Sequence, residues 1–123
     1  MSLAVLDEDR AGTVEALCEL IVPGSARVGP VAYVDAVLAA MPAEARAAAL
    51  GAFDALSGAD STDALAAAAR TPEFAIVRAL VIEAYYSDFV APGKQGPGAW
   101  AEIDFQPPLA ADLERDWSWL GIR

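Results

Sequence analysis

The stretch TPEFAIVRALVIEAYYSD, residues 71–88, decides the fold of this chain. A capping hydroxyl at Thr71, a proline at the first helical position and an acid in the first turn form a strong start signal for an α-helix. A helix that is apolar around most of its circumference is surrounded by protein, so we expect this one to be the central helix. Its apolar side chains, several of them at helical spacing on one face, are Phe74, Ile76, Val77, Leu80, Val81 and Tyr85.

Weaker helical signals lie on both sides of this stretch, separated by turn residues. Pro23-Gly24, Pro42 and Ser57-Gly58 interrupt the chain, and residues 91–98 form a Gly/Pro-rich loop. No run of useful length alternates apolar and polar residues as a strand does. The further helices that we expect are residues 7–22, residues 30–41, residues 42–56, a short helix capped by Asp60 or Ser61 that runs through Ala69, and a final short helix carrying Leu109, Leu113, Trp117 and Leu120.

These elements predict an all-α fold, a single compact bundle of five or six short helices with the Gly/Pro-rich loop before a C-terminal helix. The chain has 123 residues, which fits a single helical domain over residues 1–123. Its hydrophobic fraction of 56% is too high for a disordered chain. Residues 1–6 precede the first helix cap, so we expect them to be frayed.

The charge balance disfavours several classes of partner. Lys and Arg number 8 against 18 Asp and Glu, which gives a net charge of −10. Binding to phosphate backbones needs clustered cations, so we expect no nucleic-acid partner. No apolar run reaches the ~18 residues of a membrane-spanning helix, so we expect no direct membrane insertion. The N-terminus has no basic leader; the chain as written is expected to be cytoplasmic, and periplasmic export together with a partner stays open.

The chain is poor in chemically active side chains. It has no His, and therefore no His-containing triad, no His general base and no His-ligated metal. Cys18 lies on an apolar helix face near Glu15 and Glu19, which favours a buried structural thiol over a reactive one. We expect no catalytic residue, metal or cofactor in this chain. Glu83 and Asp88, with a tyrosine, leave a stand-alone enzyme as a weaker alternative, because helical positions five apart point about 140° away from each other.

Three segments carry a more specific signal. They are TVEALCELIVPG at residues 13–24, VAYVD at residues 31–35, and PEFAIVRALVIEAYYSD at residues 72–88, after which Gly, Trp and an aromatic-Pro segment follow. In this order they resemble the gluconate 2-dehydrogenase subunit 3 family, whose corresponding patterns are T-L-x-A-L-x-D-x-L-I-P, V-x-x-Y-I-D and F-x-x-L-R-x-x-T-x-E-G-Y-Y-S-D/S-P. The chain departs from the family at Ala84 and Asp104, where the family has Gly, and it lacks a twin-arginine signal.

The resemblance implies a small, non-catalytic accessory subunit. Such subunits bind and stabilise a large FAD-dependent sugar or alcohol oxidoreductase of the glucose-methanol-choline type, and in some complexes a cytochrome subunit accepts the electrons. FAD would belong to the partner and this chain would hold no cofactor. Tyr and Trp are frequent interface anchors. The partner interface is therefore expected in the C-terminal third of the chain, at Tyr85, Tyr86, Asp88, Trp100, Phe105, Pro107, Trp117 and Trp119.

A second function stays open beside the accessory subunit. The high apolar fraction of so short a chain favours an exposed hydrophobic patch, which is typical of a protein that binds other proteins. Such a chain could be an independent protein-interaction module or a homodimer with no redox partner. The two functions differ in whether a flavoprotein accompanies the chain.

Overall fold

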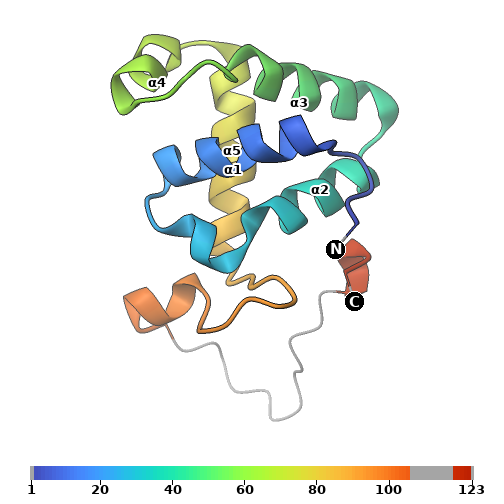
Figure 1. Cartoon of the computed structure of the whole chain (residues 1–123), viewed down its shortest axis with the longest axis vertical. Helices are drawn as coiled ribbons and strands as arrows, with labels where there is room; N and C mark the ends of the chain where they lie inside the picture. The colour runs from blue at the N-terminus through green and yellow to red at the C-terminus, as the bar shows by residue number, and fades with distance from the viewer. Residues whose placement is uncertain (1, 106–117, 123) are drawn as a thin grey trace.

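The computed structural model describes residues 2–105 and residues 118–122, and this part of the chain confirms the all-α prediction. It contains five α-helices and three short 3₁₀ helices and no β-strand among the described residues. Figure 1 shows α5 running lengthwise through the molecule, with α1, α2 and α3 crossing it. The elements in chain order are α1 (Glu8–Ile21), η1 (Ser25–Val28), α2 (Pro30–Ala40), α3 (Ala43–Ala55), α4 (Thr62–Ala68), α5 (Pro72–Tyr86), η2 (Ala99–Ile103) and η3 (Ser118–Leu120).

The central position of α5 agrees with its sequence. It packs against α1, α2 and α3, and Val77, Val81 and Ala84 are fully buried. Thr71 caps the helix, because its side-chain oxygen accepts the backbone N–H of Phe74 at 3.2 Å. Protein does not surround α5 completely, however. Its exposed side carries Ala75, Arg78, Ala79 and Glu83.

One hydrophobic core joins side chains from all five α-helices. The predicted ends of the first four helices lie within one residue of the observed ends. The cap of α4 is Ser61, whose side chain accepts the N–H of Ala64 at 3.1 Å. Of the predicted final helix, Leu109, Leu113 and Trp117 lie outside the described residues. Leu120, in η3, is buried and η3 packs on α2.

The first residues of the chain are anchored rather than frayed. The backbone N–H groups of Ala4, Val5 and Leu6 donate to the carboxylate of Asp35 at 2.8, 2.9 and 2.9 Å. Asp35 lies on α2 and is buried, and so is Leu6. A buried carboxylate needs hydrogen-bond donors in place of water. The sequence prediction was wrong for Ala4–Leu6, because these donors come from a segment about 30 residues earlier in the chain.

Candidate functional site: an aromatic platform at the end of α5

The site begins where α5 ends and the chain turns back. The N–H of Ser87 donates to the carbonyl oxygen of Glu83 at 3.1 Å and closes the last helical turn. Asp88 then takes a left-handed backbone conformation with φ 66°, which short polar residues tolerate better than most. Its buried carboxylate accepts the N–H of Trp100 at 3.1 Å. Asp88 therefore holds the start of η2 against the end of α5.

Gly98 makes this close contact between α5 and η2 possible. A Cβ atom on Gly98 would lie 2.1 Å from Oδ1 of Asp88 and 2.6 Å from its carbonyl oxygen. Both distances are far inside van der Waals contact, and one of the atoms is rigid backbone. A side chain at this position would push η2 away from Asp88, so glycine is required here for steric reasons.

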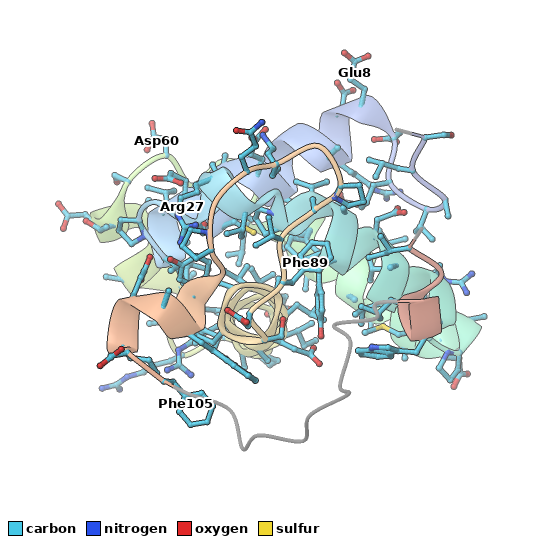
Figure 2. The ribbon with its side chains drawn as sticks, turned by 90° about the horizontal axis from the view of Figure 1, so that it is seen from below. Glu8, Arg27, Asp60, Phe89 and Phe105 are labelled. Carbon is cyan, nitrogen blue, oxygen red and sulfur yellow. The ribbon has the colours of Figure 1, made fainter. Side chains whose placement is uncertain are left out.

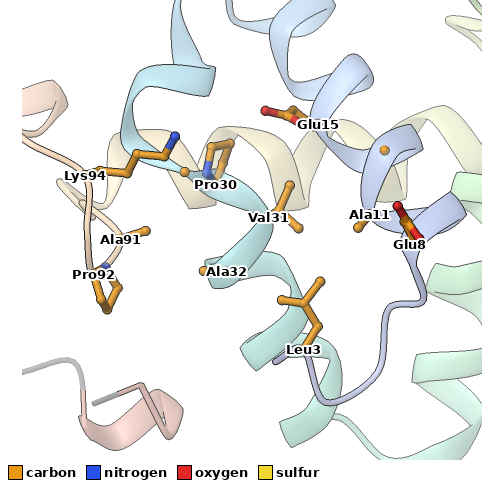
Figure 3. Close-up of a pocket in the computed structure, with 12 residues that line it drawn as sticks. Leu3, Glu8, Ala11, Glu15, Pro30, Val31, Ala32, Ala91, Pro92 and Lys94 are labelled. Carbon is orange, nitrogen blue, oxygen red and sulfur yellow. The ribbon is translucent and has the colours of Figure 1, made fainter. Parts of the chain in front are cut away.

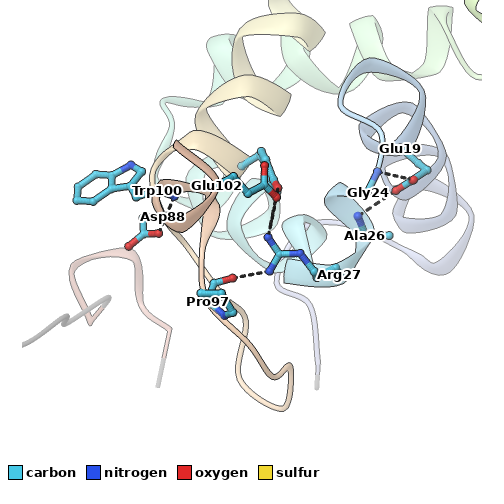
Figure 4. A network of polar contacts seen from close by, with 9 residues as sticks. Glu19, Gly24, Ala26, Arg27, Asp88, Pro97, Trp100 and Glu102 are labelled. Carbon is cyan, nitrogen blue, oxygen red and sulfur yellow. Dashed lines mark hydrogen bonds and ion pairs between the residues drawn. The ribbon is translucent and has the colours of Figure 1, made fainter. Parts of the chain in front are cut away.

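Arg27, from η1, ties the same region together from the other side (Figure 4). Its Nη2 atom donates to Oε1 of Glu102 at 3.1 Å and to the hydroxyl of Tyr85 at 3.3 Å, and its Nη1 atom donates to the carbonyl oxygen of Pro97. The hydroxyl of Tyr85 also donates to Oε1 of Glu102. One guanidinium thus connects η1, α5, the Gly/Pro-rich loop and η2.

The ionisation of these groups suits the network. Hydrogen bonds from Tyr85 and then from Arg27 lower the pKa of Glu102. Burial, and next the hydrogen bond to Glu102, raise the pKa of Tyr85. At neutral pH, Glu102 is therefore a carboxylate that accepts and Tyr85 is a neutral phenol that donates. The Arg27–Glu102 pair is solvent-exposed, so its role is to fix geometry rather than to supply much stability.

Above this frame lies a surface that we call the aromatic platform, formed by Tyr86, Trp100, Ile103 and Phe105. Nε1 of Trp100 donates to the carbonyl oxygen of Tyr86 at 2.8 Å, and the Trp100 and Phe105 rings meet edge to face with centroids 5.0 Å apart. Tyr86 is 48%, Phe105 47% and Ile103 66% exposed. Figure 2 shows Phe105 projecting away from the body of the domain. Trp100 and Phe105 thus support each other, and large apolar side chains face solvent beside them.

The residues predicted for the interface divide into three groups. Tyr86, Trp100 and Phe105 come together in the platform. Tyr85 and Asp88 do not lie on the surface of the platform, because both are buried and bonded inside the chain. Trp119 is 68% exposed, but η3 lies beside α2 and the N-terminus, on the other side of the molecule from η2 (Figure 1). Pro107 and Trp117 lie outside the described residues.

Sequence reasoning missed the residues that support the platform. Arg27 had no motif around it, and its contacts to Glu102 and Pro97 span 75 and 70 residues. Gly98 was one of several glycines in the Gly/Pro-rich loop, and nothing in the sequence distinguishes it from Gly93 or Gly96. A contact between distant segments leaves no local periodicity, so no sequence pattern could have identified these positions.

The chemical groups that the sequence suggests lie in separate environments among the described residues. They contain no group of three or more His, Cys, Asp or Glu side chains that could hold a metal ion. Glu83 is exposed whereas Asp88 is buried against η2, so the two carboxylates do not form an acid–base pair in one cleft. Burial, with smaller effects from Glu15 and Glu19, raises the pKa of the Cys18 thiol to about 12. Cys18 is therefore not a nucleophile at neutral pH.

Comparison with known proteins identifies no relative. No protein-family model, curated protein or solved structure matches the chain. Among the described residues, no helix combines the length and the hydrophobicity needed to cross a membrane.

Proposed function

We propose that this chain is a non-catalytic accessory subunit that binds and stabilises a large FAD-dependent sugar or alcohol oxidoreductase, with the aromatic platform as its docking surface. The observation that carries the proposal is the cluster of aromatic rings at the end of α5, in which Tyr86 and Phe105 are about half exposed and Trp100 is partly buried. The type of partner comes from the resemblance of residues 13–35 and 72–107 to the gluconate 2-dehydrogenase subunit 3 family.

The segment of highest resemblance also builds the platform. In the string from Glu83 to Asp88, Tyr85 and Asp88 bond inward to η2, and Tyr86 between them faces solvent. Folding alone would account for Tyr85 and Asp88, because both bond to η2 inside the chain. The ring of Tyr86 packs edge to face on the ring of Tyr85, with centroids 5.1 Å apart, and is still 48% exposed. Its exposed part is available to a partner, and its carbonyl oxygen accepts from Trp100.

The geometry favours binding for an energetic reason. Aromatic anchors contribute most to interface affinity when they are already fixed, because less side-chain entropy is lost on association. The Trp100 indole is held by a hydrogen bond and by the Phe105 ring. The platform is therefore preorganised, as a docking surface should be. FAD remains with the partner, and no residue of this chain is assigned a role in redox chemistry.

The test is co-purification from the native host with substitutions inside and outside the platform. Tyr86→Ala and Phe105→Ala remove exposed rings and should reduce the amount of recovered flavoprotein at least tenfold, since anchor residues contribute about 2 kcal/mol or more. Trp119→Ala is the matched control, because it removes an even more exposed ring away from the platform. Equal recovery of the flavoprotein by all three variants would show that the platform is not part of the interface.

An independent interaction module or homodimer is the second candidate, favoured by the same exposed rings. The two candidates differ in what binds to the platform, a flavoprotein in the first and a second copy of this chain or an unrelated protein in the second. If size-exclusion chromatography with light scattering gives a dimer that Tyr86→Ala converts to a monomer, and no flavoprotein is recovered, the platform is a self-association surface.

A further inference from the structure

A second surface, made of residues outside the aromatic platform, is a groove between α1, the first turn of α2 and the loop that follows α5 (Figure 3). Its volume is about 440 Å³, and it is open to solvent. Small-molecule sites enclose roughly 70–90% of their ligand, whereas an open groove covers one side of its occupant. The apolar part of the lining consists of Leu3, Ala11, Val31, Ala32, Ala91 and Pro92.

The loop side of the groove is rigid. Lys94 N–H donates to the carbonyl oxygen of Ala91 at 3.0 Å across a tight turn that has Gly93 at φ 86°. Ala91 N–H donates to the carbonyl oxygen of Val28 at 2.8 Å and fixes this turn to the start of α2. The groove is therefore a preformed feature of the fold and needs no rearrangement to accept an occupant.

The two sides of the groove carry opposite charges. Glu8 and Glu15 lie on α1, seven residues or about two turns apart, and Lys94 lies across from them (Figure 3). The ion pairs among the described residues are Arg10–Asp54 and Arg27–Glu102. Glu8, Glu15 and Lys94 therefore form no ion pair within the described part of the chain.

On the α1 side, the residues between Glu8 and Glu15 that line the groove have small side chains or none. Gly12 lies there beside Ala11, and a Cβ atom on Gly12 would meet nothing within 4 Å. The missing side chain leaves room for another backbone to approach α1 closely. One stripe along α1 therefore consists of two small residues, at positions 11 and 12, between two acidic residues, at positions 8 and 15.

We propose that this groove binds an amphipathic α-helix of a partner protein. The helix would place small and apolar residues on the groove floor, two cations seven residues apart toward Glu8 and Glu15, and an acid toward Lys94. Glu8 and Glu15 favour cations on the occupant, which a second copy of this chain, with 8 Lys and Arg against 18 Asp and Glu, is poorly suited to supply. The inference does not depend on the partner being a flavoprotein, and it uses residues outside the aromatic platform.

The first test uses two synthetic fluorescein-labelled helical peptides of opposite charge pattern. One carries two Arg seven residues apart on one flank of an Ala/Leu stripe and a Glu on the other flank, and in the second each Arg is replaced by Glu and the Glu by Arg. Fluorescence anisotropy with the full chain should show saturable binding of the first peptide and at least tenfold weaker binding of the second. Equal affinities, or no saturable binding of either peptide, would overturn the proposal.

The second test reverses the charges of the groove. The triple variant Glu8→Lys, Glu15→Lys and Lys94→Glu should reverse the preference, so that the second peptide binds more tightly than the first. These side chains are exposed, so the variant is expected to fold, which circular dichroism checks. An unchanged preference would place the peptide elsewhere on the protein and contradict the proposal.

A matched pair of glycine variants tests the close approach to α1. Gly12→Ala should weaken binding of the first peptide at least fivefold, whereas Gly51→Ala should leave it unchanged. Gly51 is likewise an exposed glycine inside a helix with open space at its Cβ position, but it does not line the groove. Tyr86→Ala should also leave peptide binding unchanged, which separates this proposal from the docking function of the platform. Equal effects of both glycine variants would count against a helix lying on α1.

Discussion

At the scale of single residues, Asp88 and Gly98 decide whether the platform exists. Asp88 takes a left-handed conformation and holds Trp100, and Gly98 leaves space for the Asp88 carboxylate. Neither residue is exposed enough to contact a partner strongly. Their effect on binding is therefore indirect and acts through the position of η2.

Replacing Gly98 should damage both stability and docking. Gly98→Ala forces a methyl group into the space of the Asp88 carboxylate, and overpacking of this kind costs about 1–3 kcal/mol. Urea denaturation should show this loss. The control is Gly58→Ala, where a Cβ atom would meet nothing within 4 Å. If Gly98→Ala were as stable as Gly58→Ala, the close packing of Asp88 and Gly98 would be contradicted.

The thiol of Cys18 should be inert in the folded protein. Burial raises its pKa to about 12, so almost no thiolate is present at pH 8. Labelling with a thiol reagent should be slow in the native state and rapid in urea. Because the folded-state pKa lies above the ordinary value of 9.0, the contribution to stability is complete below pH 9 and decreases as the pH rises toward 12. Cys18→Ala should flatten this decrease, and rapid native labelling would contradict burial.

At the scale of elements, the helices were predictable and their connections were not. Thr71, Pro72 and the apolar spacing of α5 are local signals, and local signals determine helices. The loop between Gly24 and Gly29 contains η1, which only the structure reveals, and η1 carries Arg27. The platform follows the same division, since the sequence indicated its exposed rings but not the Arg27 network beneath them.

The hydrogen bonds that anchor the N-terminal segment to α2 can be tested by removing their acceptor. Asp35→Ala leaves the N–H groups of Ala4, Val5 and Leu6 without their acceptor, and hydrogen bonds to a charged group contribute about 1.5–3 kcal/mol each. Hydrogen exchange should become fast at these three amides, and the free energy of unfolding should decrease by about 2 kcal/mol or more. Asp63→Ala, at an exposed position in α4, is the control. Unchanged protection of Ala4–Leu6 would contradict the anchor.

The two helix-interior glycines predict a gain in stability. Gly12 in α1 and Gly51 in α3 have open space at the Cβ position, and glycine inside a helix costs roughly 0.5–1 kcal/mol relative to alanine. Gly12→Ala and Gly51→Ala should each raise the free energy of unfolding by about this amount. A loss of stability in Gly12→Ala would mean that α1 is more crowded than its geometry indicates.

At the scale of the whole molecule, charge and exposed rings have separate consequences. A net charge of −10 attracts a basic surface over a long range and affects chiefly the rate of association. The rings of the platform affect chiefly dissociation, because they are desolvated only after contact. The association rate with a partner should therefore decrease as salt increases, while Tyr86→Ala should mainly raise the dissociation rate. Surface plasmon resonance separates the two effects, and a salt-independent association rate would exclude steering by charge.

The most direct test of the accessory-subunit function is the visible absorption spectrum of whatever co-purifies with the tagged chain from its native host. The proposal predicts a large protein in fixed proportion to this chain and the absorption bands of a bound flavin, both lost in Tyr86→Ala. A colourless preparation that contains this chain alone would contradict the proposed function and leave the platform as the surface of an independent module.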